Sequence, residues 1–449
     1  MIRNIKHLVL FLIFILLVNC SFHKSKIWSG TEEEKKRIAD IKKEQNKTVE
    51  VIKIYSSENI YSKEISSSKT VTLSKPQKNI SWQSSNLNPQ NFTGNIYLPR
   101  ITNNFLKKRI GKDKFSMSNV KSSPLSINNN IIFSDDMGSI FNINQRGKVN
   151  WKKNIYKKIY KKVFKNLSFS IYKNAIYIAD NIGFIYALDL DTGKLIWIKN
   201  HGIPIKSKLK IFENKIFLID QDNQLFCLDV KKGTKIWNIR SIPTFIKSQN
   251  FLGLAVSKKG DVIALGSSGD LVKAKASNGS IYWSINTTGS MYANVSDFFK
   301  SSDVVIADED IILSTSASTL SININNGYPN WEREITSTNS PIVDGNNIFL
   351  VSDNGYFINL DRYTGKTVRS VNLLKILKRK KQKTLITGFI LGSGKIYATT
   401  LNGYLIVCSA ISGKIEYFKK IGDTITSSPI ASNGSLYILT EKSRILGFN

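Results

Sequence analysis

Reactive side chains are few in this sequence, and their spacing does not match a catalytic or metal site. The three histidines are widely separated, at His7, His23 and His201. A zinc site needs Cys and His at short, regular spacings, which these positions do not provide. Asp180, Asp220 and Asp353 each follow an apolar run, where Asp commonly caps a turn. We therefore expect no catalytic residue, no metal ligand and no cofactor.

Cys20 is the one cysteine placed for covalent modification. Arg3 and Lys6 precede an apolar run from Leu8 to Val18, and Cys20 follows it after Asn19. A basic start and a short apolar core are typical of a secretory signal, and the run is too short for a permanent membrane span. The position of Cys20 resembles a lipobox, whose Cys is acylated in bacterial lipoproteins. Asn19 departs from the small residue usual there, so the alternative is an ordinary signal peptide with an incidental cysteine.

The segment after Cys20 is polar and mixed in charge up to about residue 78, which indicates a tether with a short helix near residues 31–45. Ser21, rather than Asp, follows Cys20, which is compatible with sorting to the outer membrane. The other cysteines, Cys227 and Cys408, lie in apolar runs. Two such residues do not make a disulfide framework, so we interpret them as buried free thiols.

Positive charge is in large excess, with 64 Lys and Arg against 33 Asp and Glu and a formal net charge of +31. Such a surplus attracts polyanions. Lysines are spread along the whole chain, which favours a compositional bias, but residues 151–165 and 375–383 are dense basic clusters. An exported protein seldom meets nucleic acid. We expect either an anionic membrane surface or an acidic partner at these clusters, or a solvated charge run.

A repeat organises the rest of the chain. A glycine lies four residues before an aromatic residue in most units, most clearly in Asp189-Leu-Asp-Thr-Gly-Lys-Leu-Ile-Trp197. The repeat glycines are 147, 193, 233, 279, 327, 365 and 413, so the gaps run from 38 to 48 residues. The tryptophans of these units are Trp151, Trp197, Trp237, Trp283 and Trp331. This period fits one four-stranded blade of a β-propeller.

The number of blades follows from the seven repeat units and the chain that remains. Short runs such as 175–179, 215–219 and 436–439 are rich in β-branched and aromatic residues, as strands are. After Tyr417 three more strands fit, around 425–431, 435–440 and 444–448. The missing outer strand of the last blade is expected to come from residues 79–82, with Trp82 as its tryptophan. We therefore predict an all-β, eight-bladed propeller over residues 79–449, after a signal peptide (1–19) and a tether (20–78).

The pattern of residues 189–197 resembles the tryptophan-docking repeat of quinoprotein propellers. In that repeat the glycine turns the hairpin and the tryptophan packs between blades, a structural docking role that we expect for Trp82, Trp151, Trp197, Trp237, Trp283 and Trp331. Together with Cys20, the tether and the closing strand, the layout over residues 79–449 resembles the BamB family. BamB is a lipoprotein subunit of the outer-membrane β-barrel assembly machinery.

This resemblance implies a non-enzymatic scaffold on the periplasmic face of the outer membrane. Its partners would be the POTRA domains of the central barrel subunit, unfolded outer-membrane protein precursors and, through a lipid at Cys20, the membrane itself. The family's contact loop would fall at Phe245, Ile246 and Lys247, and one acidic contact at Asp297. Phe299 stands where the family has a second acidic residue. The alternative is that both segments are ordinary inter-blade loops.

A quinone-dependent dehydrogenase or sensor shares the repeat and remains the alternative function. Such enzymes need a calcium site, a general-base Asp and often a pair of adjacent cysteines. No Cys-Cys pair is present, and no loop insertion that would build a cofactor pocket is recognisable.

Overall fold

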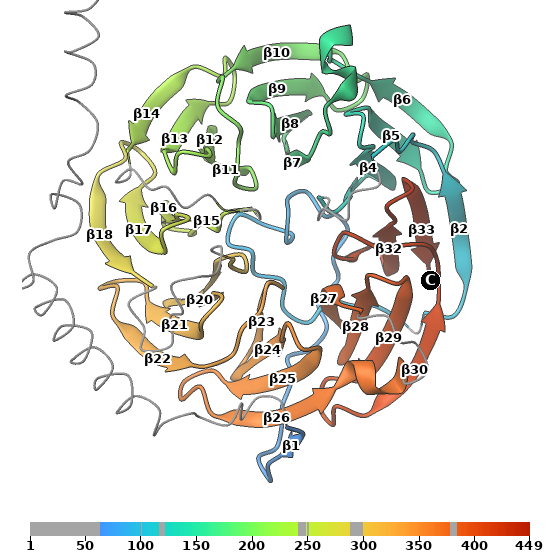
Figure 1. Cartoon of the computed structure of the whole chain (residues 1–449), viewed down its shortest axis with the longest axis vertical. Helices are drawn as coiled ribbons and strands as arrows, with labels where there is room; N and C mark the ends of the chain where they lie inside the picture. Colours follow the sequence, from blue (N-terminus) through green and yellow to red (C-terminus); the bar gives the residue numbers. More distant parts are fainter. Residues whose placement is uncertain are drawn as a thin grey trace, which may run out of the picture. The chain divides into compact units, whose positions relative to one another are not determined.

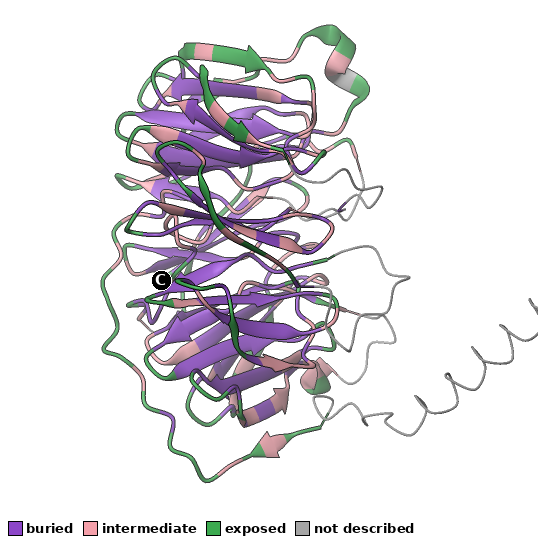
Figure 2. Ribbon diagram, turned by 90° about the vertical axis from the view of Figure 1, so that its left-hand side faces the viewer, coloured by how far each residue is buried: buried purple, intermediate pink, exposed green. Residues whose placement is uncertain are grey.

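Four-stranded antiparallel sheets are the repeating unit of this protein. The computed structural model describes residues 63–99, 101–115, 122–240, 248, 251–287, 300–377 and 384–449. Eight sheets, or blades, are arranged around a common centre (Figure 1). The predicted eight-bladed propeller is therefore confirmed. Seen from the side, the strands lie in a disc whose interior is buried, while the turns and outer strands are exposed (Figure 2).

Each blade runs from a short innermost strand to a strand on the rim. Blade 1 consists of β3 (Leu125–Ile127), β4 (Asn130–Ser134), β5 (Ile140–Asn144) and β6 (Val149–Lys153), and blade 2 of β7 (Leu167–Tyr172), β8 (Ala175–Asp180), β9 (Phe184–Asp189) and β10 (Leu195–Asn200). Blade 3 consists of β11 (Lys210–Phe212), β12 (Lys215–Ile219), β13 (Leu225–Asp229) and β14 (Lys235–Ile239). Blade 4 consists of β15 (Leu254–Val256), β16 (Asp261–Leu265), β17 (Asp270–Lys275) and β18 (Ile281–Asn286).

Blades 5 to 8 follow the same plan. Blade 5 consists of β19 (Val305–Ala307), β20 (Asp310–Ser314), β21 (Thr319–Asn323) and β22 (Pro329–Arg333), and blade 6 of β23 (Ile342–Asp344), β24 (Asn347–Val351), β25 (Tyr356–Asp361) and β26 (Thr367–Asn372). Blade 7 consists of β27 (Ile386–Gly392), β28 (Lys395–Thr400), β29 (Tyr404–Ser409) and β30 (Ile415–Lys420). Blade 8 consists of β31 (Ile430–Ser432), β32 (Ser435–Leu439), β33 (Arg444–Phe448) and β2 (Asn104–Arg109). The strands expected at 175–179, 215–219, 435–440 and 444–448 are present, whereas the strand expected around 425–431 is confined to β31 (Ile430–Ser432).

The ring is closed by an N-terminal strand, but not by the one around Trp82 that we expected. β2 pairs antiparallel with β33 and completes blade 8, with Leu106 opposite Gly447. Trp82 instead forms an isolated bridge with Ser126 on the innermost strand of blade 1. The prediction of the closing strand was wrong because it relied on residue type alone. Trp82 packs at the centre of the ring and not at its rim. Closure removes the free edge that the last blade would otherwise present.

The repeat tryptophans lie between neighbouring blades. The ring of Trp151, in blade 1, covers Gly193 of blade 2 so closely that a Cβ on this glycine would lie 2.6 Å from it. Gly193 also has a φ of +66°, which favours glycine. The indole N–H of Trp151 donates to the carbonyl oxygen of Leu190 at 3.0 Å. Equivalent contacts join Trp197 to Gly233, Trp237 to Gly279, Trp283 to Gly327 and Trp331 to Gly365.

Residues 74–98, which we call the axial segment, cross the centre of the ring (blue in Figure 1). This segment makes a hydrogen bond with every blade. From blade 1 to blade 8 its partners are Ser126, Ile171, Lys210, Val256, Ile306, Asp344, Leu391 and Asn433. Because most of these bonds involve the innermost strands, the axial segment ties the eight blades together from the inside.

Two short 3₁₀ helices and one extra strand complete the described structure. η3 (Lys158–Lys162) connects blades 1 and 2, and η4 (Leu373–Leu377) follows blade 6. β1 (Ile65–Ser66) pairs with the rim strand β26 and adds a fifth strand to blade 6. It belongs to the segment that we expected to be the end of the tether, whose boundaries stay a prediction. No helix in the described residues is both long and apolar enough to cross a membrane.

Candidate functional site

The residues expected to bind a partner lie outside the described residues. Phe245, Ile246 and Lys247 belong to the connection between β14 and β15, and Asp297 belongs to the connection between β18 and β19. Each connection leaves the rim strand of one blade and returns to the innermost strand of the next. The two connections therefore start at neighbouring junctions, between blades 3 and 4 and between blades 4 and 5. Cys20 also lies outside the described residues.

The carboxylates that could have served as a general base stabilise turns instead. Asp180 accepts the backbone N–H groups of Ile182, Gly183 and Phe184 at 2.8–2.9 Å. Burial raises the pKa of Asp180, and these bonds oppose the rise. Asp220 accepts two backbone N–H groups of its own turn in the same way. The interpretation as turn caps is confirmed for Asp180 and Asp220, whereas Asp353 accepts hydrogen bonds from the backbone N–H and the hydroxyl of Thr338.

The histidine and the thiols of the propeller are also structural. His201 lies 3.0 Å from the Oδ2 of Asp220 and stacks on the ring of Phe226. Cys227 and Cys408 are buried free thiols, as expected, and burial raises the pKa of each to about 12. Both sulfurs therefore stay protonated at neutral pH and are poor nucleophiles. In the part of the chain that the structure describes, no three His, Cys, Asp or Glu residues are grouped to hold a metal.

A buried lysine holds the axial segment. Lys210, on the innermost strand of blade 3, is fully buried. Its ammonium donates to the carbonyl oxygen of Ser85 at 2.9 Å and to Oδ1 of Asn91 at 2.5 Å. The side-chain nitrogen of Asn91 donates in turn to the carbonyl oxygens of Leu254 and Val304. Asn91 thus connects the inner ends of blades 3, 4 and 5.

A buried carboxylate completes this network. Asp303 lies just before β19, and its Oδ2 is 2.6 Å from the ammonium of Lys208. The same oxygen accepts hydrogen bonds from Asn86 at 2.7 Å and from Ser340 at 2.5 Å. Burial alone would raise the pKa of Asp303, but Lys208, Ser340 and Lys210 lower it to about 2. Asp303 therefore stays ionised and links the axial segment to blades 3, 5 and 6.

Lys210 makes the stability of the ring depend on pH. Burial lowers its pKa to about 7, whereas an exposed lysine titrates near ~10.4. Between these values the unfolded chain binds more protons than the folded one, so the free energy of unfolding rises with pH. Relative to Lys210→Met, we expect the wild-type protein to gain up to about 1.4 kcal/mol per pH unit between about pH 8 and 9.

Urea unfolding at several pH values measures this difference, with Lys194→Met as the matched variant of an exposed lysine. Parallel pH profiles for the wild-type protein and Lys210→Met would contradict the shifted pKa of Lys210.

Sequence reasoning missed this network, although two signals pointed to it. Lys210 interrupts an apolar run between Leu209 and Ile211. A lysine in a strand of the core is almost never fully buried unless its charge is paired. Residues 84–95 are rich in Asn and Ser and show no strand alternation. Neither signal identifies its partner, because Lys210 and Asn91 are 119 positions apart in the sequence.

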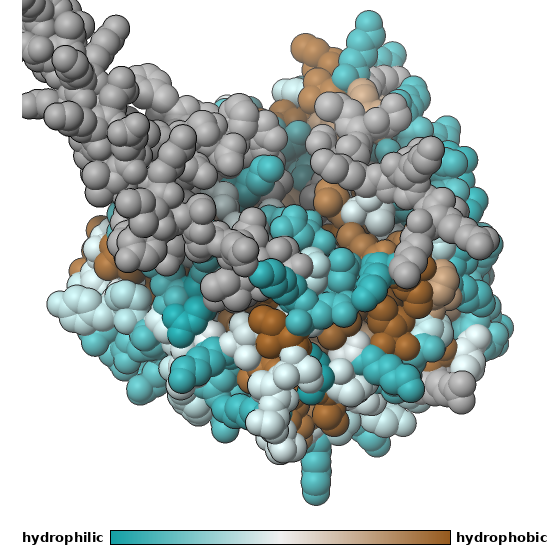
Figure 3. Space-filling model, turned by 60° about the horizontal axis from the view of Figure 1, so that its bottom comes forward, coloured by the Kyte–Doolittle hydropathy of each residue, from teal (hydrophilic) through white to brown (hydrophobic). Residues whose placement is uncertain are grey.

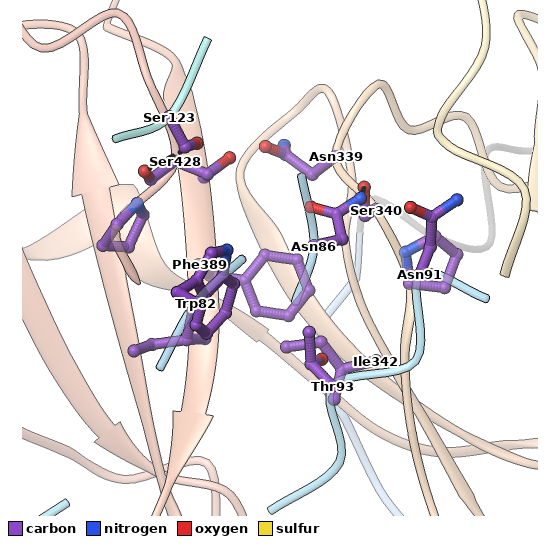
Figure 4. A pocket seen from close by; sticks show the side chains of 14 residues that line it. Trp82, Asn86, Asn91, Thr93, Ser123, Asn339, Ser340, Ile342, Phe389 and Ser428 are labelled. Atoms are coloured by element: carbon purple, nitrogen blue, oxygen red, sulfur yellow. Dashed lines mark hydrogen bonds between the residues drawn. The ribbon is translucent and has the colours of Figure 1, made fainter. Parts of the chain in front are cut away.

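A small cavity lies between the axial segment and the inner ends of blades 6, 7 and 8. Trp82 and Phe389 lie side by side on one wall, and Asn339, Ser340 and Asn86 lie across from them (Figure 4). The volume left between these side chains is about 20 Å³. A cavity of this size holds about one water molecule. No quinone fits there.

A larger groove lies on the rim between blades 6 and 7. Arg369 stands here in place of a repeat tryptophan, and its alkyl chain together with Val371 covers Gly413. The groove has a volume of about 520 Å³ and is lined by Val371, Ile376 and Ile415 with Lys375 and Lys414 at its edge. Figure 3 shows the side of the ring that carries β1, where apolar patches (brown) lie between polar side chains. The groove is open to solvent, and the carboxylate of Glu64 in its lining is paired with Lys375 at 3.3 Å.

Comparison with known proteins gives the family. A family model described as outer membrane protein assembly factor BamB matches residues 136–371, which is more than half of the chain. The chain belongs to the BamB family. The matched region extends from the first blade to the rim strand of blade 6 and includes all five tryptophan–glycine contacts between blades.

Curated relatives match over a shorter stretch. The outer membrane protein assembly factor BamB of Escherichia coli (strain K12) is 27% identical over 136 residues, which are 30% of this chain and 33% of the relative. The factor of the same name from Shigella dysenteriae gives the same values. The match therefore spans about a third of the length of these relatives.

Solved structures share the fold at low sequence identity. BamB from Moraxella catarrhalis superposes with a TM-score of 0.61 at 14% identity and covers 77% of this chain and 100% of its own. A europium-containing methanol dehydrogenase superposes with a TM-score of 0.62 at 11% identity and covers 82% of this chain and 90% of its own. At such identities the likeness concerns the propeller fold, which family members and dehydrogenases have in common.

Proposed function

We propose that this protein is a non-enzymatic scaffold subunit of the outer-membrane β-barrel assembly machinery. It docks the POTRA domains of the central barrel subunit and aids the insertion of outer-membrane protein precursors. Membership of the BamB family supports this role. In the proposal, residues 1–19 are a signal peptide, Cys20 carries a lipid in the outer membrane, and the polar tether that follows Cys20 places the propeller in the periplasm.

The filled centre of the ring is the observation that favours binding over catalysis. A dehydrogenase of this fold must hold a quinone and a calcium ion. The axial segment instead occupies the place where the inner strands converge, and the pocket beside Trp82 and Phe389 has room for about one water molecule. The described residues also bring no cluster of carboxylates together for calcium. Both observations favour a binding protein over a quinone-dependent enzyme.

The partner site of this proposal consists of Phe245, Ile246 and Lys247 in one inter-blade connection and Asp297 in the next. Their connections begin at neighbouring junctions of the ring, so one partner surface can span both. Apolar side chains with flanking charges are typical of the centre and edge of a protein–protein interface.

A pull-down of the tagged full chain from its own envelope in mild detergent tests the role and the site. We expect a POTRA-containing barrel protein to be recovered, and Phe245→Ala/Ile246→Ala/Asp297→Ala to lower its recovery at least about tenfold, because interface hot spots contribute about 2 kcal/mol or more each. The matched control is Phe418→Ala/Ile411→Ala/Asp191→Ala, which removes one Phe, one Ile and one Asp from exposed positions elsewhere on the ring.

The outcomes separate the role from the site. Equal recovery by both triple variants would keep the assembly role and discard these contact residues. If no barrel-assembly subunit is recovered with the wild-type chain, the proposed role is wrong. Titration with a quinone cofactor and calcium then tests the enzyme alternative.

A further inference from the structure

The connection between blades 1 and 2 presents a surface that the proposed scaffold role does not use. Residues 154–165, which include η3 and which we call the η3 loop, follow β6 and precede β7. From residue 151 to residue 165 the chain has seven lysines and no acidic residue. Ile159 is 79% exposed, and Val163 is 43% exposed. Figure 2 shows η3 standing out from the ring at one end of the disc.

The η3 loop is firmly attached at its base. The hydroxyl of Tyr156 donates to Asp180 at 2.5 Å, and its ring packs edge-on against Tyr160 and Phe184. The ammonium of the buried Lys165 donates to the carbonyl oxygen of Tyr160. The aromatic residues therefore face the ring, and they hold the exposed lysines and Ile159 on the outer side.

Acidic groups near the η3 loop are engaged in the fold. Asp136 accepts the backbone N–H groups of Lys114 and Phe115, and Asp135 accepts that of Lys112. The ring of Phe115 meets that of Phe164 with a centroid distance of 6.2 Å, which brings the exposed Lys112 and Lys114 beside the η3 loop. Asp113, between them, accepts a hydrogen bond from Ser443. The exposed charge of this surface is therefore predominantly positive.

We propose that the η3 loop binds an anionic membrane surface. Lys157, Lys158 and Lys162 are exposed and would lie among anionic headgroups, which attract basic side chains near a membrane surface. Ile159 and Val163 enter the boundary between headgroups and acyl chains, where exposed aliphatic side chains between lysines are favoured. Single-stranded nucleic acid fits less well, because base stacking needs exposed aromatic rings and those of Tyr156 and Tyr160 pack inward.

Binding of the full chain to vesicles tests this surface. Flotation compares vesicles of phosphatidylcholine alone with vesicles that contain about 30% phosphatidylglycerol, an anionic surface of the kind that attracts basic segments. We expect Lys157→Gln/Lys158→Gln/Lys162→Gln to lower the partition into anionic vesicles by roughly tenfold to a hundredfold. The N-terminal apolar run is common to every variant, so differences between variants report the η3 loop.

The matched control is Lys231→Gln/Lys232→Gln/Lys235→Gln, which removes the same charge from exposed lysines of blade 3. A second readout is hydrogen exchange of residues 154–165, which anionic vesicles should slow and neutral vesicles should not. Ile159→Ser should weaken partition without changing its salt dependence.

If the two triple variants lost the same amount of partition into anionic vesicles, the proposal would be overturned, because net charge alone would then explain binding. Unchanged hydrogen exchange in the η3 loop would also overturn it and would leave an acidic protein as the partner of this surface.

Discussion

Replacing Asp303 by alanine should lower the free energy of unfolding by about 3–5 kcal/mol, because removing one partner leaves a buried charge uncompensated. The carboxylate of Asp303 holds Lys208 at 2.6 Å and lies close enough to Lys210 for each to shift the pKa of the other. It also accepts hydrogen bonds from Asn86 and Ser340, which join the axial segment to blades 5 and 6. Urea unfolding at neutral pH measures the effect.

Two further variants decide whether the buried charge is responsible. Asp191→Ala removes an exposed carboxylate from the turn between β9 and β10, where φ is not positive, so it should cost about 0.5 kcal/mol or less. Lys208→Met combined with Asp303→Leu removes both charges and should be less destabilising than Asp303→Ala alone. If Asp303→Ala lowered the free energy of unfolding no more than Asp191→Ala, the network would not hold the axial segment in place.

Replacing Trp331 by alanine should cost about 3–5 kcal/mol, the range for removing a buried tryptophan. Its ring lies between blades 5 and 6, where it covers Gly365, and its indole N–H donates to the carbonyl oxygen of Arg362 at 2.7 Å. The guanidinium of Arg333 lies over the same ring. Loss of the ring therefore leaves a cavity at a blade junction and an unpaired carbonyl.

Trp331→Phe retains most of the buried ring but loses the N–H donor. It should therefore lower the free energy of unfolding by only about 1–2 kcal/mol relative to the wild-type protein. Tyr328→Ala removes an aromatic side chain that is 71% exposed and should change the free energy of unfolding by about 0.5 kcal/mol or less. Guanidinium unfolding of the three variants gives the comparison. Equal midpoints for Trp331→Ala and Tyr328→Ala would show that the tryptophan does not hold the blades together.

Much of the propeller can be read from local sequence, because each blade repeats the same hairpins. The second strand of a blade is a short run of β-branched and aromatic residues, and it is buried on both faces, as in β12 and β24. The glycine–tryptophan spacing arises from the turn before the rim strand, where only glycine avoids the neighbouring indole. Such signals can be recognised in windows of fewer than ten residues, although each glycine meets the tryptophan of the preceding blade, as Gly193 meets Trp151.

The closing strand could not be identified in this way. β2 has the sequence NFLKKR with only Leu106 buried, so it carries neither strand alternation nor a tryptophan. Its conformation is decided by the unpaired edge of β33, which is more than 300 positions away in the sequence. Trp82 has the residue type of a docking tryptophan but bridges to blade 1 at the centre of the ring.

By itself the sequence determined the all-β class, the number of blades and the repeat positions of the tryptophans and glycines, because these follow from short-range patterns that recur along the chain. The tertiary structure alone decided which N-terminal strand closes the ring and that residues 74–98 fill its centre. The buried contacts of Lys210, Asn91 and Asp303 arise only when eight inner strands converge on one axis. Burying a polar side chain there costs free energy unless it is hydrogen-bonded or ion-paired, and the groups that bind it come from other blades.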